Sequence, residues 1–194
     1  MIQSPVAVAF LDNHDVIVAE DYRVQRFDRS GRSHVVIGRY SLKPAGVAVS
    51  KDGLLAVADK ASRTVRFFHD DGRDVSPSRR WPERLFGMPA GLAVVRSTGN
   101  IVVVDAEQRT VTVRAPGTRP PSPGVALFGI QSEWLGNPTH VAVDNDGTTF
   151  VSDALHLSVK VSCSYCAYVE RDWLSLCLSE HKTEHIVIKI VDLS

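Results

Sequence analysis

The sequence predicts an all-β fold, because a pattern of three short strands recurs along the chain. The clearest copy, LKPAGVAVSKDGLLAVADKASRTVRFF at 42–68, has two apolar strands around an Asp-Gly turn, then a polar loop and a third strand. Such a meander cannot bury its own faces. Equivalent copies begin around Pro5, Pro44, Pro89 and Pro138. Repeats of several strands at a period of about 40–50 residues predict a β-propeller.

The repeats divide residues 1–161 into about four blades. The second blade carries a basic, aromatic insertion, SRRWPER, and the third ends in a Pro/Gly loop, APGTRPPSPG. The fourth breaks off after its third predicted strand, so we expect a partial or open propeller. The expected blades are 4–41, 42–85, 86–134 and 135–161, followed by a non-repeat tail at 162–194.

An acidic residue closes the second strand of each copy. In the first copy this residue is Glu20 or Asp21, with a loop two residues shorter if Glu20 is the equivalent. A carboxylate at a strand end accepts hydrogen bonds from loop N–H groups and pins the turn. A ring of metal-binding or acid groups is the alternative, but repetition in every blade favours a structural role. The expected turn residues are Asp21, Asp59, Asp105 and Asp153.

The repeat phrase resembles a known family. The order P-x-G-V-A-V, a turn, V-A-D and then a third apolar strand is similar to the NHL repeat over residues 4–161. This resemblance is greatest to the C-terminal repeats of tripartite-motif ubiquitin ligases. It implies a propeller, usually of six blades, whose wide faces bind partners.

Composition limits the functions that the repeats can have. The chain has 194 residues with 22 basic and 22 acidic side chains, so bulk attraction to nucleic acid is weak. The N-terminus has no basic start or long apolar core, no apolar run is long enough to span a membrane, and the repeats contain no cysteine. We therefore expect a cytoplasmic protein.

Basic and aromatic side chains gather in the loops that are predicted to emerge on one face. Arginines beside aromatic rings can anchor a peptide, grip phosphates or stack on bases. A solvated face on which basic residues pair with neighbouring acids is the alternative. The expected partner-binding residues are Arg39, Tyr40, Lys43, Lys60, Arg63, Trp81, Arg84, Arg109 and His156.

These observations predict a binding module that recognises a protein partner, as the substrate-recognition part of a ubiquitin-ligase-like regulator. Binding of single-stranded RNA by the same face is the alternative, and a metal-dependent propeller hydrolase or lyase is the second alternative. We expect no enzymatic activity and no cofactor, because the inner-strand starts offer one histidine, His140, and the repeats hold no cysteine nucleophile. Self-association could complete the open propeller.

The tail after Val161 departs from the repeat. Its spacing Cys163-x2-Cys166-x14-His181-x3-His185 lies within the range of a zinc finger, but Glu170 stands where such a finger has an aromatic residue. We therefore expect no metal site there. The last part, 185–192, alternates well enough to add a strand.

Overall fold

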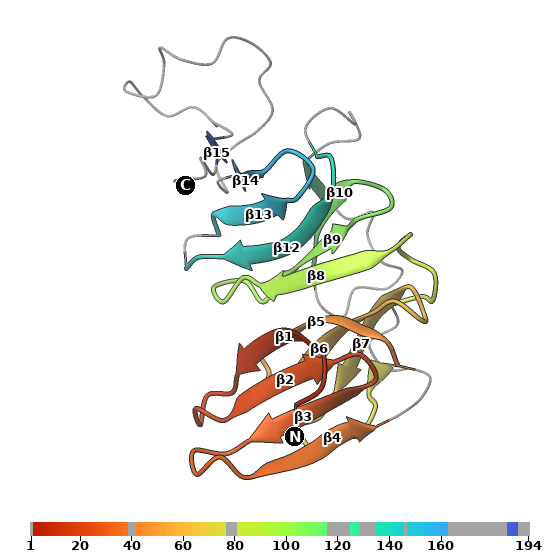
Figure 1. Cartoon of the computed structure of the whole chain (residues 1–194), viewed down its shortest axis with the longest axis vertical. Coiled ribbons are helices and arrows are strands. Elements are labelled where there is room, and N and C mark those ends of the chain that lie inside the picture. Colours follow the sequence, from red (N-terminus) through yellow and green to blue (C-terminus); the bar gives the residue numbers. More distant parts are fainter. Residues whose placement is uncertain are drawn as a thin grey trace.

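The computed structural model describes residues 2–38, 42–76, 81–115, 125–128, 135–145, 147–162 and 186–189. Its named elements are strands, arranged in four antiparallel sheets (Figure 1). No helix in these residues is long and apolar enough to cross a membrane. The expectation of an all-β, open β-propeller is therefore confirmed.

Each sheet is a meander in which consecutive strands pair. An Asp-Gly turn closes the first hairpin of the second sheet, where Gly53 takes the positive φ of 77° that the sequence predicts. The sheets are β1 Pro5–Phe10, β2 Val16–Glu20, β3 Arg23–Phe27 and β4 Ser33–Gly38; β5 Pro44–Val49, β6 Leu55–Asp59 and β7 Thr64–Phe68; β8 Pro89–Val94, β9 Ile101–Asp105, β10 Thr110–Arg114 and β11 Val125–Phe128; and β12 Pro138–Val143, β13 Thr149–Asp153, β14 Ser158–Ser162 and β15 Ile186–Lys189.

The fourth sheet extends beyond the expected end of its blade. Strand β14 continues to Ser162, and β15 pairs with it in antiparallel register, with Val161 opposite Ile186. The alternating end of the tail therefore supplies an outer strand, as its pattern indicated. The expected break after Val161 is too early for this sheet, because four residues of the tail return to it.

The innermost strands β1, β5, β8 and β12 lie side by side and follow one another along the molecule (Figure 1). Their backbones approach closely at equivalent glycines. A Cβ atom on Gly46 would lie 3.1 Å from Gly91 Cα, and one on Gly91 would lie 3.0 Å from the carbonyl oxygen of Thr139. Equivalent positions meet, so these strands run in the same direction and begin on one face of the molecule.

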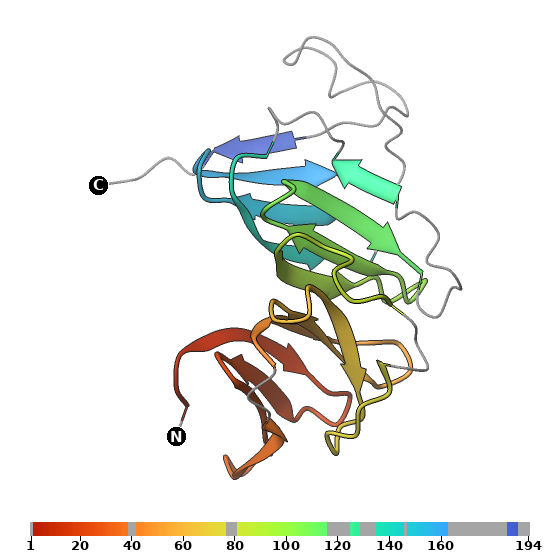
Figure 2. The same cartoon turned by 90° about the vertical axis from the view of Figure 1, so that its right-hand side faces the viewer.

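Apolar side chains fill the three spaces between consecutive sheets, and no sheet has a core of its own. The sheets stack in chain order, with the first and the fourth at opposite ends (Figure 2). The contacts are Ile17, Ala19, Val24 and Ile37 against Val47, Leu55, Val57 and Phe68; Ala56, Ala58, Val65 and Phe67 against Leu92, Ile101 and Val103; and Val102, Val104 and Val111 against Val151.

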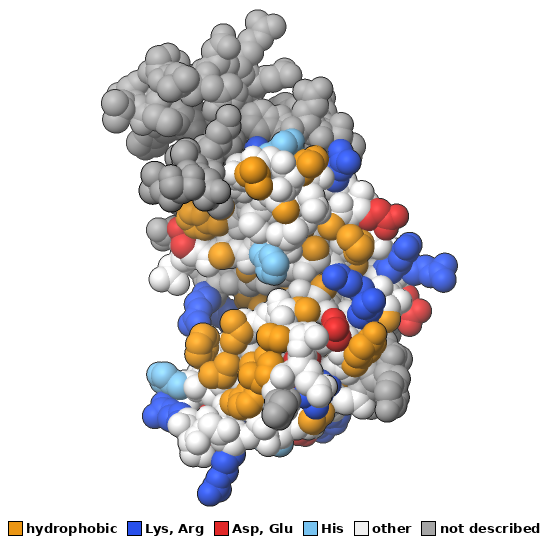
Figure 3. Space-filling view, in the orientation of Figure 1, with side chains coloured by type: hydrophobic (Ala, Val, Ile, Leu, Met, Phe, Trp, Pro, Cys, Tyr) orange, Lys and Arg blue, Asp and Glu red, His pale blue; other side chains and the backbone are white. Residues whose placement is uncertain are grey.

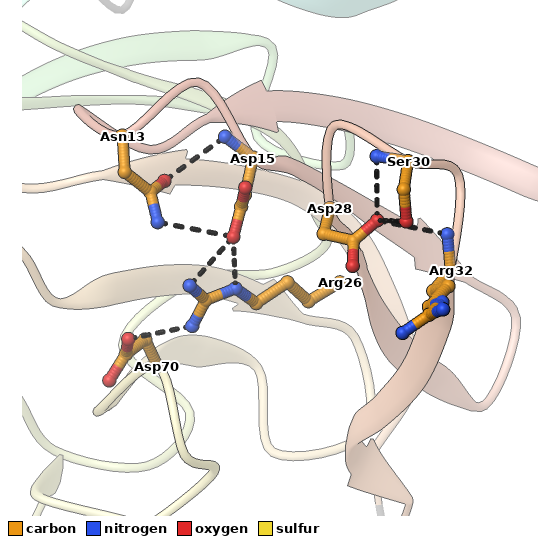
Figure 4. Close-up of polar contacts among 7 residues, drawn as sticks. All are labelled: Asn13, Asp15, Arg26, Asp28, Ser30, Arg32 and Asp70. Carbon is orange, nitrogen blue, oxygen red and sulfur yellow. Dashed lines mark hydrogen bonds and ion pairs between the residues drawn. The ribbon is translucent and has the colours of Figure 1, made fainter.

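A polar bridge also joins the first two sheets on the side opposite the strand starts. Arg26 on β3 donates to Asp15 in the β1–β2 turn, at 2.8 Å from Nε to Oδ2, and to Asp70 after β7, at 2.8 Å from Nη1 to Oδ2 (Figure 4). The hydrogen bond to Asp15 is the main cause that raises the pKa of Arg26, and it outweighs the effect of burial. The guanidinium therefore fixes the first sheet to the second.

Candidate functional site

One face of the molecule is formed by two sets of loops. The loops that enter the innermost strands lie next to the loops between the second and third strands, as backbone hydrogen bonds of 2.9 Å from Lys60 to Lys43 and from Ala106 to Met88 show. We call this surface the loop face. It consists of residues 2–4 and 21–22, 42–43 and 60–63, 84–88 and 106–109, and 135–137 and 154–157.

Buried carboxylates hold the loop face together. Asp59 accepts hydrogen bonds from the backbone of Lys43 at 2.8 Å and Ala61 at 3.0 Å. Asp105 is bonded in the same way by Gly87, at 2.7 Å, and by backbone N–H groups of the loop that follows it. Each carboxylate thus joins the two loops of its blade, which is the arrangement of a structural pin.

In the first sheet the buried carboxylate belongs to Glu20, and Asp21 is exposed. The longer side chain of Glu20 reaches the backbone N–H of Gln3 at 2.9 Å and the guanidinium of Arg23 at 2.9 Å. The expected role of Asp21 is therefore wrong. Only Glu20 ends β2 opposite Pro5, in the position that the aspartates hold in the other sheets.

Asp153 shows how strongly such a carboxylate is held. Burial alone would raise the pKa of Asp153, but hydrogen bonds from the backbone of Asn137 and Gly136 and from His156 outweigh burial and lower this pKa to about 2. The Nδ1 atom of His156 lies 2.8 Å from Oδ2 of Asp153. His156, predicted as a partner-binding residue, thus sits on the loop face with one ring nitrogen engaged by the pin.

The basic residues predicted for partner binding lie largely on this face. The side chains of Lys43, Lys60, Arg63, Arg84 and Arg109 are exposed. Arg63 lies 3.8 Å from Glu107, an exposed pair that contributes little to stability. Arg63 and Arg109 stand at equivalent loop positions with φ of 55° and 53°. Their side chains are therefore presented by the same backbone geometry in two neighbouring blades.

Three predicted residues do not contribute to this surface as expected. Arg39 and Tyr40 lie outside the described residues. Trp81 is buried between the second and third sheets, where its ring packs edge-on against Phe67 at 5.6 Å between centroids and beside Phe86 at 6.3 Å. The prediction that Trp81 is a partner-binding residue is wrong, because its side chain is buried in the core between these two sheets.

The loop face also has an apolar part, which the repeat pattern did not predict. Leu155 and Leu157, in the loop after β13, are 63% and 70% exposed, and Tyr22 and Met88 are exposed on the same face. Leu157 occupies the loop position that Arg63 and Arg109 hold in the other blades and shares their positive φ. A leucine in an otherwise polar loop position was the available signal.

The described residues offer no group of three or more His, Cys, Asp or Glu side chains that could hold a metal ion. His140, at the start of the innermost strand β12, is exposed, and its backbone N–H donates to Ser152 at 3.1 Å. The candidate zinc residues Cys163, Cys166, His181 and His185 lie outside the part of the chain that the structure describes.

Known proteins place this fold among propellers with different functions. No family model matches the chain. Among solved structures, a nidogen/laminin complex has a TM-score of 0.67 at 19% identity, covering 84% of this chain and 60% of that chain. A streptogramin B lyase has a TM-score of 0.65 at 11% identity, with coverages of 96% and 55%. A gluconolactonase from Xanthomonas campestris has a TM-score of 0.62 at 20% identity, with coverages of 81% and 57%.

These neighbours correct the expectation that the chain is not an enzyme. A lyase and a gluconolactonase are among them, so the fold gives no ground for excluding catalysis, and that expectation is contradicted. The chain spans about 55–60% of the length of these solved chains. At such low identities the likeness concerns the fold alone.

One human protein is more similar in sequence to this chain than these solved structures are. The chain is 35% identical over 118 residues to the human NHL-repeat-containing protein 4, a match that covers 61% of this chain and 89% of that protein. The match agrees with the repeat phrase, with the four stacked meanders and with the pinned loops of each blade. The chain belongs to the NHL-repeat proteins.

Proposed function

We propose that this chain recognises a protein partner through its loop face, and that the bound segment carries acidic and apolar side chains. One observation carries the proposal. Exposed cations of the second and third blades, Lys60, Arg63 and Arg109, share a face with the exposed Leu155 and Leu157 of the fourth. Arginines together with exposed apolar side chains on one surface are typical of protein interfaces.

The pinned loops support this role. Asp59, Asp105 and Asp153 bond each pair of loops through backbone N–H groups, so the surface is held in shape before a partner arrives. A preorganised surface loses less conformational entropy on binding and therefore binds more tightly. The same carboxylates are buried, so they stabilise the loops without forming part of the exposed surface.

As a further step, we place this recognition in a ubiquitin-ligase-like regulator. The likeness of the repeat phrase to tripartite-motif proteins supports this step. In such a regulator the propeller would select the substrate, and a RING domain would supply the ubiquitin transfer. Co-precipitation of a RING-containing protein that disappears with the loop-face variants described below would test it.

Single-stranded RNA is the second candidate, favoured by the exposed cations of the loop face. Stacking platforms for bases need exposed aromatic rings. The burial of Trp81 removes one of the two aromatic residues that the sequence suggested for this purpose. Tyr22, in the loop between β2 and β3, is an exposed aromatic residue of the loop face. Protein recognition is therefore the better supported function.

A peptide library displayed on phage and selected on the folded chain tests the proposal. We expect the selected peptides to combine Asp or Glu with Leu, Ile or Phe. Binding of such a peptide should weaken at least about tenfold in the double variant Lys60→Glu, Arg63→Glu and in Leu155→Ser, Leu157→Ser. The matched control is Arg29→Glu, Arg96→Glu, which reverses two exposed charges in the turns of the opposite side.

Equal affinities in the loop-face and control variants would overturn the proposal. Binding of a single-stranded RNA pool at physiological salt would favour the second candidate instead, if it is lost in Lys60→Glu, Arg63→Glu. In that case the logarithm of affinity should fall with the logarithm of salt concentration by about 0.7 per phosphate contact. The variant Lys60→Glu, Arg63→Glu should make this slope shallower by about the amount that two phosphate contacts contribute.

A further inference from the structure

The first sheet exposes an apolar surface that the other sheets bury. In each later blade, one side of the sheet packs against the preceding blade, and we call this side the leading face. In the second blade it consists of Val47, Val49, Leu55, Val57 and Phe68, which lie against the first sheet. The opposite side, which packs against the following blade, is the trailing face.

The repeat gives the first blade a leading face of the same kind. Counting from the opening prolines and the closing carboxylates, its residues are Val8, Phe10, Val16, Val18 and Phe27. Their pairing, with Val8 opposite Val18 and Phe10 opposite Val16, places them on one side of the sheet. All five are apolar, as in the second blade.

The exposure of equivalent residues differs most along β1. Val8 is 58% exposed, whereas its equivalent Val47 is 4% exposed, and Phe10 is 62% exposed. Val16 and Phe27 are half-buried and Val18 is buried, so the β1 side is the exposed part of this face. In Figure 3 hydrophobic side chains form a patch over β1 and β2. The leading face of the first blade thus has the residues of an inter-blade contact without a blade against it.

The fourth blade carries the complementary surface. Its trailing face, equivalent to Ala48, Ala56, Ala58, Val65 and Phe67 of the second blade, consists of Ala142, Phe150, Ser152, Val159 and Val161. Ala142 pairs with Phe150, and Ser152 with Val159, so these residues share one side of the sheet. Ala142 is exposed, Phe150, Ser152 and Val159 are half-buried, and Val161 is buried. Four of the five positions are apolar, as an inter-blade contact requires.

We propose that a second copy of this chain docks its fourth blade, through the trailing face, onto the leading face of the first blade. The contact would repeat the packing that already joins consecutive blades within the chain. Both halves of the contact are present on one molecule, which makes a second copy the occupant that fits. Zero net charge at neutral pH leaves no overall repulsion between copies. Such a head-to-tail contact can close into a ring of two copies, with eight blades in all.

Sedimentation of the folded chain over a range of concentrations tests the proposal. We expect wild-type protein to associate reversibly at micromolar concentrations, and Val8→Glu, Phe10→Glu to weaken association by about tenfold or more. The matched control is Tyr22→Glu, because Tyr22 lies in the same blade with the same exposed fraction, 58%, but on the loop face. Circular dichroism and thermal melting should show that all variants remain folded, since the replaced side chains are exposed.

A mixing experiment identifies the partner surface. Ala142→Glu should also abolish association by itself, because it places a charge on the trailing face. A mixture of Val8→Glu, Phe10→Glu protein with Ala142→Glu protein should then form dimers, since each variant keeps the face that the other has lost. Wild-type protein that stays monomeric to about 100 μM, association that survives both variants, or a mixture that stays monomeric would each overturn the proposal.

Discussion

At the scale of single residues, Asp153 couples the stability of the loop face to pH. Its folded-state pKa of about 2 lies below the ordinary value of 3.8, so its contribution to stability is complete above pH 4 and lost as the pH falls toward 2. The size of this contribution is about 2 kcal/mol. We expect Asp153→Asn to lower the free energy of unfolding at pH 7 by about 1–3 kcal/mol and to flatten its decline below pH 4.

Urea unfolding followed by tryptophan fluorescence between pH 2 and 7 measures both effects. The matched control is Asp12→Asn, which removes an exposed carboxylate from a turn on the opposite side. If Asp153→Asn and wild-type protein lost stability with the same slope in acid, Asp153 would not be the group that titrates.

Trp81 and the strand-end carboxylates show where single residues could be understood from sequence. Each carboxylate follows a short apolar strand in a repeated phrase, so local spacing alone indicates a turn pin. Trp81 stands in an insertion outside that phrase, and its burial depends on Phe67 and Phe86 from two neighbouring blades. Such long-range packing has no local signal. The exposed Leu157 could have been found, because it breaks the pattern set by Arg63 and Arg109.

At the scale of elements, a polar side chain takes part in a contact between blades. Arg26 is the polar part of the first contact, where it bridges Asp15 of the same sheet and Asp70 of the next. Arg26→Met should lower the free energy of unfolding by about 1–3 kcal/mol, because it leaves the buried Asp15 without its cation. Asp70→Ala should cost less, about 0–1 kcal/mol, since Asp70 is exposed.

The control for Arg26 is Arg32→Met in the adjoining β3–β4 turn, shown with it in Figure 4. Arg32 is exposed, and it contacts Asp28 through its backbone N–H, which the substitution keeps. Its effect on urea unfolding should stay within about 0.5 kcal/mol. Equal losses for Arg26→Met and Arg32→Met would show that the bridge does not stabilise the contact between the sheets.

The repeat phrase predicted the first three strands of each blade better than it predicted the outer strand. Alternation and turn residues indicate the first three strands of each blade, which are local meanders with short connections. The strand β15 returns from the end of the tail to pair with β14 across a long separation in sequence. Its alternation suggested a strand, but no local feature identified the sheet that it joins.

At the scale of the whole molecule, a stack of blades is a nearly one-dimensional structure, in which each unit is stabilised by its neighbours. The second sheet is covered on both faces, by Ile17 and Ala19 of the first and by Leu92 and Val103 of the third. The leading face of the first sheet has no sheet packed against it among the described residues, and Val8 and Phe10 on it are exposed. In dilute solution, amide hydrogen exchange should therefore be at least roughly tenfold faster in β2 than in the equivalent strand β6.

The dependence of this difference in exchange rate on protein concentration also tests the proposed contact between copies. If a second copy covers the leading face, raising the protein concentration should slow exchange in β1 and β2 while β6 keeps its rate, because only the first blade gains a neighbour. Hydrogen exchange read by mass spectrometry resolves these strands. The Val8→Glu, Phe10→Glu variant should keep fast exchange in β2 at every concentration, whereas Tyr22→Glu should behave as wild type. Uniform slowing in all strands would point to general aggregation and would contradict docking at the leading face.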